Sequence, residues 1–159
     1  MNPKVLRIEK RINAEPSKLF RAWLNAEDFS RWFLSGEGIG IESVTLDARP
    51  GGKFLINMTL DGKILPHEGE YIKIEEPTKL VFTWRSQATE NRDTLVTITF
   101  QEIFDDLGKN TNDSRQKPKT LITLIQEELV TDIQVKMHHH GWTCILEGLD
   151  SWMGEYLKK

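Results

Sequence analysis

The sequence predicts an α+β fold in which a seven-stranded, curved antiparallel sheet wraps around one long C-terminal helix. Short runs rich in β-branched and aromatic residues alternate with turn signals from residue 39 to residue 126. Residues 132–157 carry a single apolar stripe at helical spacing. The 159 residues suit one domain, residues 1–159, and a sheet with one apolar face needs a cover. We therefore expect the long helix to lie on the sheet.

The N-terminal segment predicts one strand and two short helices. Residues 4–12 alternate apolar and charged side chains, as a strand with one buried face does. Pro16 suits the first turn of a helix, where its missing N–H costs nothing. Apolar residues then recur at helical spacing up to Leu24, and again over residues 26–33. Both helices precede the main part of the sheet.

Six further strands are expected after these helices. Asp61-Gly62 lies between two β-rich runs and is a strong signal for a tight hairpin. Residues 105–118 are polar and lack periodicity, which predicts a long mobile hairpin loop. The six strands are predicted at residues 39–46, 53–60, 63–74, 79–86, 94–103 and 119–127.

The long helix supplies the surface that should face the sheet. Thr131 or Asp132 can cap its first turn. His138 lies four residues before Trp142 on the same stripe. The apolar members of the stripe are Trp142, Ile145, Leu149, Trp152 and Tyr156. A curved sheet leaves a gap where it diverges from such a helix, so we expect an apolar pocket between them.

Strand alternation selects the side chains that should line this pocket. Most are apolar, and the five tryptophans of the chain could fill the gap as readily as line it. Glu70, Gln126 and His138 are the polar groups expected to orient a ligand. The predicted ligand-binding residues are Trp23, Trp32, Phe54, Met58, Glu70, Phe82, Trp84, Ile98, Leu124, Gln126, His138, Trp142, Ile145 and Leu149.

Composition argues against several classes of function. A net charge of −3 gives no general attraction to nucleic acid or to an anionic membrane. No run approaches the roughly 20 apolar residues that span a bilayer, and the first residues lack the apolar stretch of a signal peptide. The only cysteine, Cys144, excludes an internal disulfide. We expect a cytoplasmic protein.

Neither a metal nor another cofactor is predicted. Side chains of consecutive helical residues point about 100° apart, so His138, His139 and His140 cannot converge on one ion. Nothing in the sequence marks Cys144 as a reactive thiol, and it is interpreted as packed or half-exposed. Asp47 and Arg49, before Pro50-Gly51-Gly52, are interpreted as a surface ion pair at a tight turn.

A string of short motifs spans nearly the whole chain, from Val5 to Tyr156. Each motif is weak alone, but their order is specific. The string resembles the domain related to the C-terminal part of Aha-type activators of heat-shock protein 90 ATPase, within the START-like (Bet v-like, SRPBCC) superfamily. The motifs are Phe20-x-Ala22-Trp23, Arg31-Trp32-Phe33, Asp47-x-Arg49-Pro50-Gly51-Gly52-x-Phe54, Asp61-Gly62, Gly69-x-Tyr71, Glu76-Pro77-x-x-Leu80-Val81-Phe82-Thr83-Trp84 and Gly141-Trp142.

This resemblance implies a helix-grip fold with an internal cavity, but it does not imply one function. Proteins of this superfamily bind lipids, hormones or polyketides, and some are enzymes or protein partners. Many relatives carry a histidine near the position of Gln126, so a role for that histidine does not transfer to this chain.

Three functions remain open from the sequence. The first is binding of a small hydrophobic molecule, such as a lipid, a polyketide or an aromatic metabolite. The second is docking on a heat-shock chaperone. The third is a pocket enzyme of the cyclase or hydrolase type, for which Glu70 and His138 are the only acid or base candidates. No Ser-His-Asp, Cys-His or paired-carboxylate arrangement is recognised, and no catalytic residue is assigned.

Overall fold

The computed structural model describes residues 3–33, 36–104 and 117–157. Their strands and helices confirm the predicted α+β fold, and the predicted bounds lie within two residues of the observed ones. Most of the loop predicted at residues 105–118 lies outside the described residues. The elements are β1 (Lys4–Ile12), α1 (Pro16–Leu24), α2 (Ala26–Trp32), β2 (Ile39–Leu46), β3 (Lys53–Leu60), β4 (Lys63–Glu75), β5 (Lys79–Trp84), the 3₁₀ turn η1 (Gln87–Thr89), β6 (Thr94–Ile103), β7 (Lys119–Leu129) and α3 (Asp132–Leu157).

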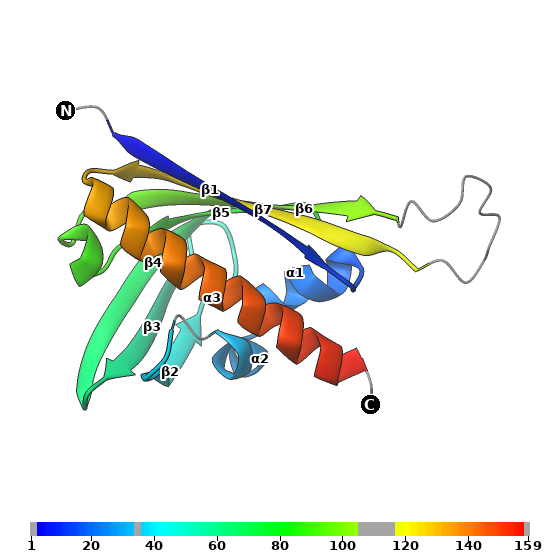
Figure 1. Cartoon of the computed structure of the whole chain (residues 1–159), viewed down its shortest axis with the longest axis horizontal. Helices are drawn as coiled ribbons and strands as arrows, with labels where there is room; N and C mark the ends of the chain where they lie inside the picture. The colour runs from blue at the N-terminus through cyan, green and yellow to red at the C-terminus, as the bar shows by residue number, and fades with distance from the viewer. Residues whose placement is uncertain (1–2, 34–35, 105–116, 158–159) are drawn as a thin grey trace.

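The strands form one antiparallel sheet in the order β1-β7-β6-β5-β4-β3-β2. The sheet curves, and α3 runs across its concave side (Figure 1). The apolar side chains of that side form the core together with α1, α2 and α3. None of the described helices is long and apolar enough to cross a membrane. The helix-grip arrangement therefore has one concave surface on which a pocket can form.

Two local contacts position α3. The backbone N–H of Gln134 donates to Oγ1 of Thr131 at 3.0 Å, which satisfies a free donor of the first turn of α3. In the second half of α3, a Cβ at Gly148 would lie 2.6 Å from the backbone oxygen of Trp32. Glycine therefore allows α3 to cross α2 in close contact.

A bulge in β4 corrects the predicted facing of its side chains. Tyr71 pairs with Phe82 but Lys73 pairs with Val81, so one extra residue interrupts the alternation. Tyr71 is consequently buried on the concave side, whereas Ile72 is 50% exposed. The prediction that Glu70 faces the pocket is wrong because strict alternation does not hold across the bulge.

The apolar stripe of α3 also differs from the prediction near its end. Trp142, Ile145 and Leu149 are buried as expected, but Met153 takes the next buried position. Met153 lies eleven residues after Trp142, which is about three full turns, so both point the same way. Tyr156 is 53% exposed and stacks on half-buried Trp152 with ring centroids 5.3 Å apart.

Candidate functional site

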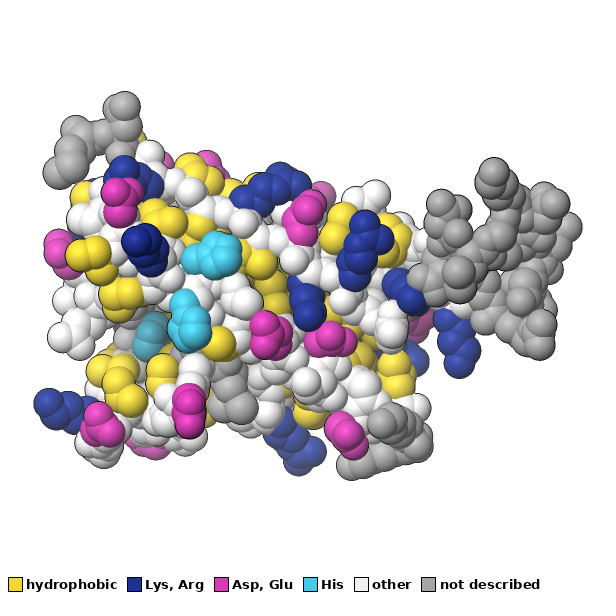
Figure 2. All heavy atoms as spheres, viewed as in Figure 1, with side chains coloured by type: hydrophobic (Ala, Val, Ile, Leu, Met, Phe, Trp, Pro, Cys, Tyr) yellow, Lys and Arg dark blue, Asp and Glu magenta, His cyan; other side chains and the backbone are white. Residues whose placement is uncertain are grey.

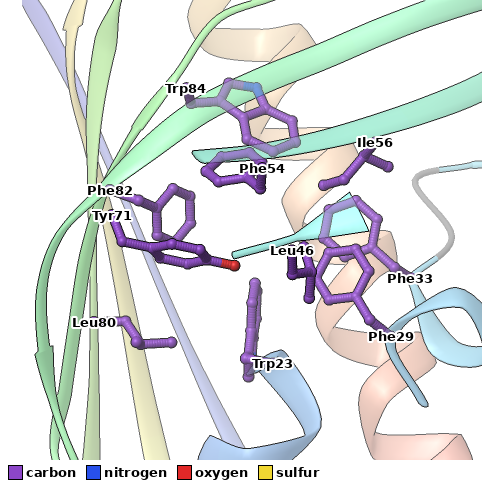
Figure 3. Close-up of a pocket in the computed structure, with 10 residues that line it drawn as sticks. All are labelled: Trp23, Phe29, Phe33, Leu46, Phe54, Ile56, Tyr71, Leu80, Phe82 and Trp84. Atoms are coloured by element: carbon purple, nitrogen blue, oxygen red, sulfur yellow. The ribbon is translucent and has the colours of Figure 1, made fainter. Parts of the chain in front are cut away.

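Two hollows lie along the concave side of the sheet. The first, here called the inner cavity, has a volume of about 20 Å³, little more than one water molecule needs. Figure 3 shows its aromatic side chains converging from the sheet on one side and from α1 and α2 on the other. The inner cavity is lined by Trp23, Phe29, Phe33, Leu46, Phe54, Ile56, Tyr71, Leu80, Phe82 and Trp84.

Aromatic rings pack against one another in the walls of the inner cavity. The rings of Phe29 and Phe33 stack with centroids 4.2 Å apart, and Trp23 meets Trp32 edge-on at 4.8 Å. The hydroxyl of Tyr71 points toward the middle of this group (Figure 3). Burial, with a smaller contribution from the charge of Asp47, raises the pKa of Tyr71 above its usual value of 10, so the phenol stays protonated at neutral pH. The inner cavity is thus small and almost entirely apolar.

The second hollow, here called the histidine crevice, is much larger, with a volume of about 260 Å³. It lies between the sheet, η1 and the first half of α3, and Figure 2 shows histidine side chains gathered on that face. Trp84 lines both hollows, and its ring lies 4.9 Å from that of Trp142. The crevice is lined by Ile39, Met58, His67, Trp84, Ser86, Ala88, Met137, His138, His140, Gly141, Trp142 and Ile145.

Two histidines on different elements give the crevice its chemistry. Nδ1 of His67 lies 2.9 Å from the backbone oxygen of Leu65, and Nδ1 of His138 lies 2.7 Å from that of Gln134. A carbonyl oxygen only accepts hydrogen bonds, so each Nδ1 must carry the proton and donate it. In the neutral ring Nε2 is then an acceptor. Both imidazoles are held in this tautomer by the backbone.

Burial keeps the two rings neutral. Burial lowers the pKa of His138 and of His67 below 6.5, despite the opposing hydrogen bond to a carbonyl. A positive charge on His138 would lower the pKa of His67 further. The crevice therefore presents two uncharged imidazoles at neutral pH.

His139 and His140 do not complete a metal site with His67 and His138. His139 is exposed and outside the crevice, whereas His140 lines it with Nε2 3.7 Å from Sγ of Cys144. The three consecutive rings diverge, as helical geometry requires. Within the described ranges, no group of three or more His, Cys, Asp or Glu side chains is placed to hold a metal ion.

The structure brings together about half of the predicted site residues. Met58, Trp84, His138, Trp142 and Ile145 line the crevice. Trp23, Phe54 and Phe82 line the inner cavity, together with Trp84. The remaining apolar residues of the set, Trp32, Ile98, Leu124 and Leu149, are buried in the core and line neither hollow.

Gln126 is fully buried and has a structural partner at each end of its side chain. Its Nε2 donates to Oγ1 of Thr94 at 2.9 Å, and its Oε1 accepts from Nε1 of Trp142 at 2.8 Å. Thr94 in turn donates to the backbone oxygen of Trp84 at 2.7 Å. This chain of hydrogen bonds fixes Trp142 against the sheet. Both ends of the Gln126 amide, which was expected to orient a ligand, are therefore bonded within the protein.

Glu70 lies on the opposite face of the sheet from the crevice. It borders a polar surface hollow with Lys53, Thr83 and Arg85, which lie on the convex side. Its backbone N–H donates to Oγ1 of Thr83 at 2.9 Å. Of the two acid or base candidates named from the sequence, only His138 therefore lines the crevice.

Sequence reasoning missed His67, although a signal for it was present. The hairpin at Asp61-Gly62 sets the register of β3 and β4, and this register pairs His67 with Ile56. Ile56 is buried on the concave side, and directly opposed residues share a face. Extending the hairpin register by a few residues would have placed His67 at the pocket.

The predicted surface pair between Asp47 and Arg49 is present, with Nε of Arg49 3.0 Å from Oδ1 of Asp47. The Asp47 carboxylate raises the pKa of Arg49, first by accepting its hydrogen bond and then by charge. Both side chains are largely exposed, so the ion pair stabilises the turn and does not line the pocket.

Comparisons with known proteins agree with this architecture. Residues 13–154 match the family model described as "Activator of Hsp90 ATPase homolog 1-like protein". No curated protein sequence matches the chain.

Solved structures share the fold at low sequence identity. A protein from Chromobacterium violaceum superposes with a TM-score of 0.75 at 21% identity, covering 92% of this chain and 94% of the other. An AHSA1-like protein from Aeromonas hydrophila gives 0.71 at 19% identity over 98% and 96%. An HSP90 activator from Plasmodium falciparum gives 0.66 at 21% identity over 94% and 96%.

Proposed function

The chain belongs to the activator of Hsp90 ATPase homolog 1-like family, and we propose that it binds a small hydrophobic molecule in the histidine crevice. The observation that carries the proposal is the crevice itself. Its volume of about 260 Å³ approaches the smallest ligand sites of proteins, which begin near roughly 300 Å³. An aromatic metabolite, or one end of a lipid or polyketide, fits this size.

The lining of the crevice supports the same proposal. Seven of its twelve residues are apolar, and they include the large flat surfaces of Trp84 and Trp142. The polar side chains are few and come from both walls, with His67 on β4, Ser86 just before η1, and His138 and His140 on α3. An apolar wall with a few fixed polar groups is the usual make-up of a small-molecule site.

Blocking the crevice tests the proposal. Ala88, in η1, is half-buried at the crevice, so Ala88→Trp places an indole where the ligand would lie. Gln87→Trp, one residue earlier and exposed, is the matched control. A panel of lipids, polyketides and aromatic compounds is screened by thermal shift and isothermal titration. We expect binding to wild type and to Gln87→Trp, and at least about tenfold weaker binding to Ala88→Trp, because a filled site loses its contacts.

The proposal fails if no member of the panel binds wild type, or if Ala88→Trp binds as well as Gln87→Trp. The first result would mean that the crevice is not a ligand site. The second would place the ligand elsewhere on the chain. A cytoplasmic location, expected from the single Cys144, also remains part of the proposal.

Docking on a heat-shock chaperone is a second candidate function, favoured by the family description and by the Plasmodium neighbour named as an HSP90 activator. It is tested by the ATPase rate of purified chaperone from the same organism, with and without this protein. A rate increase that saturates with added protein supports docking. An unchanged rate together with no binding at micromolar concentration removes it.

A further inference from the structure

We propose that the histidine crevice selects small aromatic molecules that carry a hydroxyl group, which donates a hydrogen bond to Nε2 of His67 or His138. This inference rests on the proposed function, because it names the class of molecule that the same site takes. It follows from the polar atoms of the crevice that are still free to bind.

The two imidazole Nε2 atoms are free acceptors. Each Nδ1 is committed to a backbone carbonyl, of Leu65 for His67 and of Gln134 for His138. Neither Nε2 has a hydrogen-bond partner in the part of the chain that the structure describes. The rings come from opposite walls of the crevice, the sheet and α3, and both border its space. A ligand between these walls can reach either acceptor.

The indole of Trp84 adds one donor beside these acceptors. The ring of His67 lies 5.2 Å from that of Trp84. Figure 3 shows the Trp84 nitrogen on the side of its ring away from the inner cavity. Nε1 of Trp84 makes no hydrogen bond to any described residue, in contrast to Nε1 of Trp142, which donates to Gln126. A hydroxyl group both donates and accepts, so it can satisfy an imidazole and an indole together.

The remaining chemistry of the crevice disfavours other polar groups. A carboxylate offers only acceptors, and it would face two acceptor nitrogens with no Lys or Arg among the crevice residues. An ether or ketone likewise cannot donate. The wide apolar surfaces of Trp84, Trp142 and Ile145 favour a flat ring as the body of the ligand. Aromatic alcohols of the phenol type combine both features.

A matched set of probes tests this selection. Naphthalen-2-ol donates a hydrogen bond, 2-methoxynaphthalene has the same ring but cannot donate, and 2-naphthoate is charged. Dissociation constants are measured by isothermal titration with wild-type protein. We expect naphthalen-2-ol to bind at least about tenfold more tightly than either other probe, because a site that must pair buried acceptors discriminates against ligands that leave them unpaired.

Two variants locate the source of the preference. In His67→Asn and His138→Asn the amide NH₂ keeps a donor near the position of Nδ1, whereas the Nε2 acceptor is lost. We expect the preference for naphthalen-2-ol over 2-methoxynaphthalene to fall to within about threefold in the double variant, with one single variant accounting for most of the loss. His139→Asn, on the same helix but outside the crevice, should keep the wild-type preference.

The possible outcomes separate this inference from the proposed function. If both neutral probes bind wild type equally, or if the double variant keeps the full preference, the hydroxyl selection is wrong while ligand binding stands. If none of the probes binds, the inference falls, and the wider panel then decides whether the proposed function falls with it. Should the Asn variants fail to fold, the wild-type ratio alone decides, and a ratio near one overturns the inference.

Discussion

The inner cavity and the histidine crevice share one concave surface and one tryptophan, Trp84, yet they differ in almost everything else. The inner cavity holds about 20 Å³ and is lined mainly by buried aromatic rings, whereas the crevice holds about 260 Å³ and carries free imidazole nitrogens. A sheet that wraps around a helix therefore does not by itself make a pocket. The side chains supplied at each end decide whether the gap is filled or left open.

Each end has an identifiable cause. At the closed end Gly148 lets α2 pack directly against α3, and α2 brings Phe29 and Trp32 with it. At the open end the residues that face the gap from η1 and α3 include Ala88 and Gly141, which are too small to fill it. Changes at each end, with one on the convex side as a reference, test this contrast between a packed end and an open end.

The largest effect is expected from a cavity-forming change at the closed end. Phe29→Ala removes a ring that is 3% exposed and packs on Trp23 and Phe33. We expect a loss of about 3–5 kcal/mol in the free energy of unfolding, measured in urea. Met137→Ala, at the crevice and 53% exposed, should change it by no more than about 0.5 kcal/mol. Similar losses in both variants would mean that the two ends are packed alike.

A second effect separates two tryptophans at the boundary between the ends. Nε1 of Trp142 donates to Gln126, whereas Nε1 of Trp23 is buried without a partner among the described residues. Trp142→Phe leaves the Gln126 oxygen unpaired in the core, but Trp23→Phe removes an unpaired donor. We therefore expect Trp142→Phe to cost about 1–3 kcal/mol more than Trp23→Phe in urea unfolding. Equal costs would show that the hydrogen bond contributes no net stability.

Between pH 5.5 and pH 7.5, a pH dependence is expected from the histidines of the open end. Burial lowers the pKa of His67 and His138 in the folded protein below the value of 6.5 that they regain on unfolding. The unfolded chain therefore binds more protons in this range, and stability falls as the pH drops through 6.5 toward the lowered values. Urea unfolding at pH 7.5 and 5.5 measures the loss. The double variant His67→Asn, His138→Asn should lose less stability than His139→Asn, and an identical loss in both contradicts burial as the cause.

The smallest effect is expected on the convex side. Glu70→Gln changes a side chain that borders the outer polar hollow, not the crevice. We expect the dissociation constant of a crevice ligand to stay within about twofold of wild type, because no contact with the ligand is altered. A tenfold change, measured by isothermal titration, would mean that Glu70 acts at the crevice after all.

Periodicity and turn chemistry were sufficient to predict the strands, the helices and the concave face. They predicted the buried positions of Trp84, Trp142 and Ile145, because these residues obey regular alternation or helical spacing. Glu70 was misplaced because a bulge depends on how two strands meet, which one strand's pattern does not reveal.

The polar part of the site was harder to predict for a physical reason. The fate of Gln126 depends on Thr94 and Trp142, which reach it from β6 and α3. Such a network exists only once these elements have packed together. His67 was within reach of the hairpin register, but the fixed tautomer of its ring depends on a backbone oxygen whose position only the structure gives.

Methyl resonances would test the contrast between the two ends most directly. Two-dimensional ¹H–¹³C spectra are recorded while naphthalen-2-ol is added to the protein. We expect the methyl signals of Met58, Ala88 and Ile145, which line only the crevice, to shift together and saturate, while those of Leu46 and Leu80 at the inner cavity stay in place. Shifts confined to Leu46 and Leu80, or no shift at either end, would contradict ligand binding in the crevice.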